Sequence, residues 1–83
     1  MPSKTPRDLS GDELVSLLRR YGYEVTRQRG SHLTLTTNLL GREHHLTVPR
    51  HGAVRVGTLR QIIGQTAAYL GRDTDEVAEE LFG

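Results

Sequence analysis

The chain of 83 residues contains no cysteine. This absence excludes disulfides, thiolate metal sites and cysteine nucleophiles together. No apolar run approaches the ~20 residues that a membrane-spanning helix needs, and the N-terminus has no apolar stretch of the signal-peptide kind. We therefore expect a cytoplasmic protein with no membrane association. A chain of this length forms one domain at most, and its stability depends on a single shared core.

The net charge is only +1, yet the charges are unevenly distributed. Residues 1–60 carry ten of the eleven basic residues against five acids, whereas residues 61–83 carry one arginine against five acids. A basic body with an acidic end is typical of a polyanion binder with one repelling or partner-facing segment. A solvated terminal helix explains the same distribution, and composition alone favours that simpler interpretation.

Local patterns predict a loose tail over residues 1–8, followed by a helix over Gly11–Tyr21. Ser10 and Glu13 have the spacing of a capping box, and an apolar stripe follows them at the helical period. Gly22 is suited to end this helix. A second helix is predicted over Thr58–Leu70. Asp73 and Glu76 resemble another capping box, which opens a short helix to about Leu81.

Between the first two helices the period changes to two, which predicts three antiparallel strands. These are Tyr23–Gln28, Ser31–Thr37 and Glu43–Val48, with a turn at Arg29-Gly30, a hairpin loop over Asn38–Gly41, and Pro49 ending the last strand. The fold class is therefore α+β, with the order α-β-β-β-α and an extra C-terminal helix. Both long helices have one apolar stripe, so we expect both on one face of the sheet. We predict a domain over 9–71 and an acidic helix over 72–83.

Strand parity divides the side chains between two sheet faces. Those expected to face the helices are Val25, Leu33, Leu35, Leu46 and Val48. Those expected to face outward are Glu24, Thr26, Gln28, His32, Thr34, Thr36, His45 and Thr47. A polar outer face is ordinary for an antiparallel sheet. Its two histidines among threonines, with Arg27 and Arg29 beside the turn, nevertheless make it a candidate site.

His32 is the strongest candidate for chemistry because it lies at a strand start among small neighbours. An imidazole exchanges protons near neutral pH, and a nearby arginine can hold a phosphate bidentately. These are the minimum parts for activating a ribose 2′-OH against the adjacent phosphodiester. A tolerated surface histidine is the simpler explanation.

The other histidines are weaker candidates. We expect His44 on the core side and partly buried, His45 outward where it could assist His32, and His51 in a loop. A zinc site of His32, His45 and His51 is conceivable, but no ligand pair has a recognised spacing, so no metal is predicted. Around His51, Arg50 and Arg55 flank glycines just before a helix, an arrangement that either binds phosphate or merely connects two elements.

Two blocks of residues resemble the HicA family of mRNA interferase toxins. The first is Gly30-Ser31-His32, after a helix that ends in Tyr21-Gly22-Tyr23. The second is Val48-Pro49-Arg50-His51 followed by Gly57-Thr58-Leu59-Arg60-Gln61-Ile62-Ile63. The resemblance covers about Leu9–Ala68.

The resemblance implies a double-stranded-RNA-binding-domain-like fold, ribonuclease activity against mRNA, and neutralisation by a HicB-type antitoxin that covers the active site. The family's catalytic histidine corresponds to His32, and His51 matches a recurrent family position with a supporting role. The threonine-rich strand after Leu33 and the acidic end from Arg72 depart from many members.

Together these features predict a metal-independent endoribonuclease that needs no cofactor. His32 would be its general base or acid, and the predicted RNA-binding residues are Arg27, Arg29, Ser31, Arg50 and His51. The sequence identifies no second proton-transfer group. Two alternatives remain at this point: a non-catalytic RNA-binding module of the same fold, and a protein-interaction module that docks through its acidic C-terminal helix. The oligomeric state is not predicted.

Overall fold

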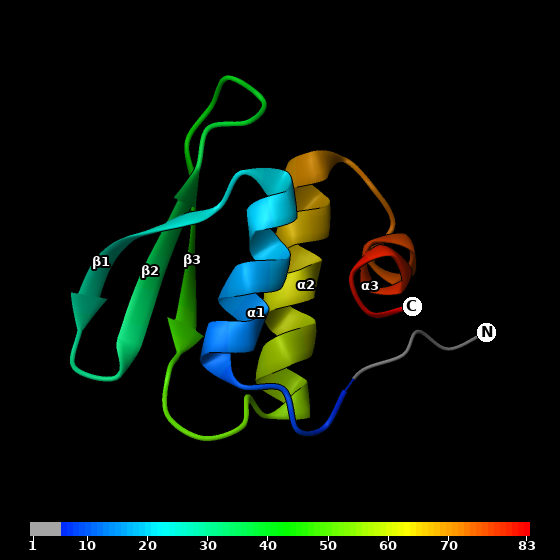
Figure 1. The fold of residues 1–83 in the computed structure, drawn as a ribbon. Coiled ribbons are helices and arrows are strands. Elements are labelled where there is room, and N and C mark those ends of the chain that lie inside the picture. The colour runs from blue at the N-terminus through cyan, green and yellow to red at the C-terminus, as the bar shows by residue number, and fades with distance from the viewer. Residues whose placement is uncertain (1–5) are drawn as a thin grey trace.

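A computed structural model of the chain describes residues 6–83. The elements are α1 (Gly11–Leu18), a 3₁₀ turn η1 (Arg19–Tyr21), β1 (Glu24–Arg29), β2 (His32–Thr37), β3 (His44–Pro49), α2 (Val56–Leu70) and α3 (Thr74–Phe82). The strands form one antiparallel sheet in the order β1-β2-β3. Figure 1 shows α1 and α2 on one side of the sheet, with α3 against α2 on the side away from it. The predicted α+β fold class is therefore confirmed.

The helix boundaries follow local signals closely. Ser10 accepts a hydrogen bond from the Glu13 backbone N–H at 3.1 Å, and the Glu13 carboxylate accepts from the Ser10 N–H at 2.9 Å. This is the predicted capping box. The last predicted turn tightens into η1, and Gly22 ends it with φ +81° in the left-handed region that favours glycine. The predicted tail over 1–8 lies mostly outside the described residues, and residues 6–8 belong to no helix or strand.

The core lies between the sheet and the helices. The sheet contributes the four predicted residues Leu33, Leu35, Leu46 and Val48, each buried. The helices and their connections contribute Leu14, Val15, Leu18, Tyr21, Val54, Leu59, Ile62, Ile63, Ala67, Val77, Ala78 and Leu81. Burial of this apolar surface is the main stabilising contribution, and it uses one face of the sheet only.

Two predictions about the later helices need correction. Helix α2 begins at Val56, two residues before the predicted Thr58, and ends as predicted at Leu70, with Gly71 as its C-cap. Asp73 caps α3 by accepting from the Asp75 N–H at 2.8 Å. The proposed reciprocal bond from Glu76 does not form, because the Glu76 carboxylate lies 3.6 Å from the Arg72 guanidinium. None of the helices within residues 6–83 is long and apolar enough to cross a membrane.

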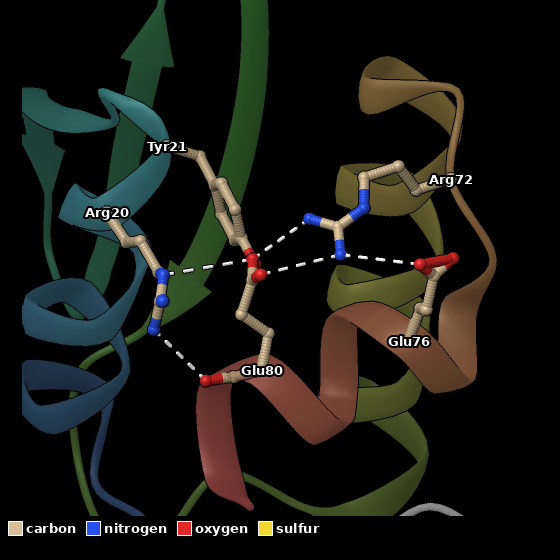
Figure 2. A network of polar contacts seen from close by, with 5 residues as sticks. All are labelled: Arg20, Tyr21, Arg72, Glu76 and Glu80. Carbon is tan, nitrogen blue, oxygen red and sulfur yellow. Dashed lines mark hydrogen bonds and ion pairs between the residues drawn. The ribbon is translucent and has the colours of Figure 1, made fainter.

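A polar network fastens α3 to the body of the fold (Figure 2). The Glu80 carboxylate accepts a hydrogen bond from the Tyr21 hydroxyl and another, at 2.9 Å, from Arg72. Arg20 donates to the Glu80 backbone carbonyl at 3.1 Å. The bond from Arg72, followed by that from Tyr21, lowers the pKa of Glu80 to about 2. Burial, followed by the bond to Glu80, raises the pKa of Tyr21 to about 12.

At the opposite end of the sheet from His32, Tyr69 holds the β2–β3 loop against α2. Its hydroxyl accepts from the Leu40 N–H and donates to the Arg42 carbonyl, both at 2.8 Å. The Arg42 guanidinium lies 4.7 Å from the centre of the Tyr69 ring, a cation–π distance. The His44 ring stacks on the Tyr69 ring at a centroid distance of 4.9 Å.

Candidate active site

A β-bulge in β1 decides which side chains lie beside His32. Val25 pairs with Leu35, but after the bulge Arg27 pairs with Thr34 and Arg29 pairs with His32. Arg27 and Arg29 therefore share the open face of the sheet with His32. Strand parity had placed Gln28 on that face, and this prediction is wrong because the extra residue reverses the alternation: Gln28 lies opposite Leu33.

β1 contributes little to the core of the fold. All six residues of this strand are exposed. Val25 lies opposite the buried Leu35, as its predicted side of the sheet requires, yet 41% of its surface remains accessible. β1 is an edge strand, and the buried residues of the sheet come from β2 and β3 instead.

His32 itself is exposed at the start of β2. It directly follows the two-residue turn Gly30-Ser31, in which Gly30 has φ +59°. On the other side of β2, His32 pairs with Pro49 in β3. The Arg50 N–H donates to the Ser31 carbonyl at 2.7 Å, so the end of β3 is fixed to the turn that presents His32.

Two hollows meet at His32. One has a volume of about 270 Å³ and is lined by Arg27, Arg29, His32 and Thr34. The other has a volume of about 390 Å³ and is lined by His32, Thr47, Pro49, His51, Ala53, Arg55 and Thr58. His32 is the residue common to both. The imidazole thus lies between a hollow with two arginines and a hollow with a second histidine and a third arginine.

The loop that forms the second hollow is held at both ends. Its first residue, Arg50, is bonded to Ser31, and the Val54 N–H donates to the Leu9 carbonyl at 2.7 Å. Ala53 forms an isolated bridge with Ser10, and the Val54 side chain is buried in the core. His51 and Arg55 are both exposed between these anchors. The backbone at His51 and Arg55 is therefore held by contacts of the loop with the turn before β2 and with the segment before α1.

The predicted site residues separate into two groups. Arg27 and Arg29 line one hollow with His32, and His51 lines the other. Arg50 lines neither, and its guanidinium lies 3.7 Å from the Asp12 carboxylate of α1.

Three threonines that line the hollows are absent from the predicted list. They are Thr34, Thr47 and Thr58. The parity of their strands signalled the first two. Arg55 is the N-cap residue of α2, no side chain caps that helix end, and Thr58 lies in its first turn. A basic residue and unpaired helical N–H groups in one place favour an anion.

The two other histidines lie away from His32. His45 pairs with Thr36 in the register, four positions from the His32–Pro49 pair, which is about 13 Å along the strand. Its Nδ1 is hydrogen-bonded to Thr36 Oγ1 at 2.8 Å, and its Nε2 lies 3.3 Å from Glu43. The predicted assistance from His45 is therefore wrong.

His44 is half-buried on the helix side, as predicted, and its Nδ1 is hydrogen-bonded to the Tyr23 hydroxyl at 2.7 Å. Burial, with smaller contributions from His45 and Arg42, lowers its pKa. His44 is thus a neutral structural group at physiological pH. Within residues 6–83 no three His, Cys, Asp or Glu side chains are grouped as a metal site would require.

A comparison with protein families identifies a match over most of the fold. The family model described as the HicA toxin of bacterial toxin–antitoxin systems matches residues 11–67, which is more than half of the chain. No curated protein and no solved structure matches the sequence. The matched range begins with α1 and includes the whole sheet, the loop after it and most of α2.

Proposed function

Because the chain belongs to the HicA family of toxins from bacterial toxin–antitoxin systems, we propose that it is a metal-independent endoribonuclease that cleaves mRNA at His32. The observation that carries this proposal is the bulge in β1, which brings Arg27 and Arg29 onto the same open face as an exposed histidine. Cations beside a proton-transfer group are what cleavage of a phosphodiester requires.

In the proposed reaction His32 is the general base. Its neutral imidazole accepts the proton of a ribose 2′-OH, and the 2′-oxygen then attacks the adjacent phosphorus atom. The developing negative charge on the phosphate oxygens is stabilised by guanidinium groups, which donate paired hydrogen bonds to phosphate. The small, polar side chain of Thr34 beside His32 leaves space for a nucleotide to approach.

RNA binding is assigned to residues that surround His32. Arg27 and Arg29 hold the phosphate chain from the first hollow, and Ser31 and His51 contact it near the turn and the second hollow. Arg50 is half-exposed beside Asp12 at 3.7 Å. An exposed ion pair of this length is weak, so Arg50 is able to exchange its carboxylate partner for a phosphate.

A HicB-type antitoxin is the proposed inhibitor. The open face of the sheet is where a protein that blocks His32 has to bind, because α1 and α2 occupy the other face. Co-expression of the antitoxin with the toxin should restore growth and remove the accessibility of His32 to a histidine-specific reagent.

The proposal is tested by inducible expression in bacteria, with growth and mRNA integrity followed over time. Wild type should arrest growth and deplete mRNA, whereas His32→Ala should do neither. Removing an exposed side chain changes stability by about 0.5 kcal/mol or less, so the variant should accumulate as folded protein. His45→Ala is the matched control, since it removes an exposed histidine from the same sheet face, and it should remain toxic.

A toxic His32→Ala variant would contradict the proposal. If wild type binds RNA without cleaving it, and His32→Ala binds equally well, the protein is a non-catalytic RNA-binding module instead. A protein-interaction module that docks through its acidic C-terminal helix would have to use the exposed face of α3, because Val77, Ala78 and Leu81 of that helix are buried in the core. A partner that binds the full chain, loses affinity on truncation after Gly71 and needs no RNA would favour that alternative.

A further inference from the structure

We propose that His51 is the second proton-transfer group of the site, the general acid that protonates the leaving 5′-oxygen. This inference rests on the proposed ribonuclease function and extends it. Cleavage by 2′-OH attack needs two proton transfers, one from the nucleophile and one to the leaving group. His32 accounts for only the first of them.

The geometry of the second hollow supports the assignment. His32 and His51 line the same hollow of about 390 Å³, together with Arg55 and Thr58 from the start of α2. They reach it from different elements, since His32 begins β2 and His51 lies in the loop after β3. A phosphate bound in this hollow would have one proton acceptor and one proton donor among the residues that line it.

His51 is also held in place by its neighbours in the chain. Arg50 N–H is bonded to the Ser31 carbonyl, one residue before His32. Three residues after His51, the buried Val54 is bonded to Leu9. The residues that precede the two histidines are thus joined by one backbone hydrogen bond of 2.7 Å, which keeps the start of β2 and the loop after β3 close together.

No other side chain that lines these hollows is suited to this proton transfer. The remaining members are arginines, threonines, a proline and an alanine. Guanidinium groups remain protonated at neutral pH, and threonine hydroxyls do not titrate there. Imidazole alone gains and loses a proton in that range.

The proposed cleavage moves two protons and replaces one bond to phosphorus with another. Neutral His32 takes the proton of the 2′-OH, and the 2′-oxygen forms a bond to phosphorus. The bond from phosphorus to the 5′-oxygen breaks, and protonated His51 gives its proton to that oxygen. The products are a 2′,3′-cyclic phosphate and a free 5′-hydroxyl. Arg55, which lines the same hollow, is placed to bind the phosphate oxygens throughout.

The test compares two RNA oligonucleotides that span a cleavage site mapped with wild type. One is ordinary RNA, and the other has sulfur in place of the 5′-oxygen at that site. A thiolate leaves without receiving a proton, so the second substrate does not need a general acid. On ordinary RNA, His51→Ala should lower kcat about 10²–10⁴-fold, the usual contribution of a proton-transfer group.

On the sulfur-containing RNA, His51→Ala should approach the wild-type rate, whereas His32→Ala should stay inactive. His45→Ala is the control and should match wild type on both substrates. A His51→Ala variant with an undiminished rate on ordinary RNA, or an equal deficit on both substrates, would overturn the proposal. If the sulfur-containing RNA restores the rate of His32→Ala instead, His32 is the general acid, and the proposal is also overturned. Wild type that cleaves neither RNA would contradict the ribonuclease function itself, a separate outcome.

Discussion

At the scale of single residues, the site depends on where three cationic side chains stand around one imidazole. Arg27 and Arg29 lie on one side of His32 and Arg55 on the other. None of the three is part of the buried core, and each belongs to an element whose backbone is fixed by pairing or by an anchored loop. The contribution that we propose for them is electrostatic, and it should be separable from folding.

Replacing both Arg27 and Arg29 with glutamine should weaken RNA binding while leaving stability almost unchanged. Each phosphate contact to single-stranded RNA adds about 0.7 to the slope of log affinity against log salt concentration. The double variant should therefore lose about 1.4 from this slope, measured by fluorescence anisotropy with His32→Ala as background. Arg19→Gln, an exposed residue after α1, is the control. An unchanged salt slope would show that the two arginines do not contact phosphate.

Residue positions on β2 and β3 could be predicted from the sequence, but those on β1 could not. Strict alternation holds where Leu33 and Leu35 are buried, because burial of one face specifies the register. β1 has no buried residue to specify it. Nothing in the side chain of Thr26 signals a bulge, so strand parity assigns Gln28 to the wrong face of the sheet.

At the scale of elements, the start of α1 could be predicted from the sequence, but the start of α2 could not. Ser10 and Glu13 cap α1 through contacts three residues apart, which sequence spacing reveals directly. Helix α2 starts at Val56, and the side chain of its N-cap residue Arg55 makes no capping hydrogen bond, so no local motif marks the start. The candidate loop before it is held by Leu9 and Ser31, contacts between residues distant in the sequence that no local pattern contains.

The β2–β3 loop offers a test of one such distant contact. Tyr69→Phe removes a hydroxyl that bonds both the Leu40 N–H and the Arg42 carbonyl. Leaving half-buried backbone groups without a partner costs about 1–3 kcal/mol, so the free energy of unfolding should fall by that amount in urea titrations. Leu40→Ala, which removes an exposed side chain of the same loop, should change it by about 0.5 kcal/mol or less. Equal effects of the two variants would contradict the assigned role of the hydroxyl.

At the scale of the whole molecule, α3 is joined to the first helical segment by residues about sixty positions apart. Val77, Ala78 and Leu81 complete the shared core, and Glu80 meets Arg20 and Tyr21 (Figure 2). The sequence shows directly that this helix is acidic. It does not show which residues the acidic side chains contact, because ion pairs between distant segments have no local signature.

This network makes stability depend on acid pH. The pKa of Glu80 is lowered to about 2 from an ordinary value of 4.5, so its contribution is present above pH 4.5 and is lost as the pH falls toward 2. Glu80→Gln should be less stable than wild type at pH 7, and the difference should shrink at pH 3, as measured by thermal unfolding. Glu79→Gln, an exposed neighbour on α3, is the control. If the difference in unfolding temperature between wild type and Glu80→Gln is the same at pH 7 and pH 3, the assigned role of the ionised Glu80 carboxylate is contradicted.

The central claim, a ribonuclease that works by 2′-OH attack at His32, is tested most directly by the chemical ends of its products. Purified wild type is incubated with RNA in the presence of a metal chelator, and the fragments are analysed by mass spectrometry. We predict 2′,3′-cyclic phosphate and 5′-hydroxyl ends, and no fragments with His32→Ala. Products with 5′-phosphate and 3′-hydroxyl ends, activity abolished by the chelator, or cleavage that persists in His32→Ala would contradict the claim.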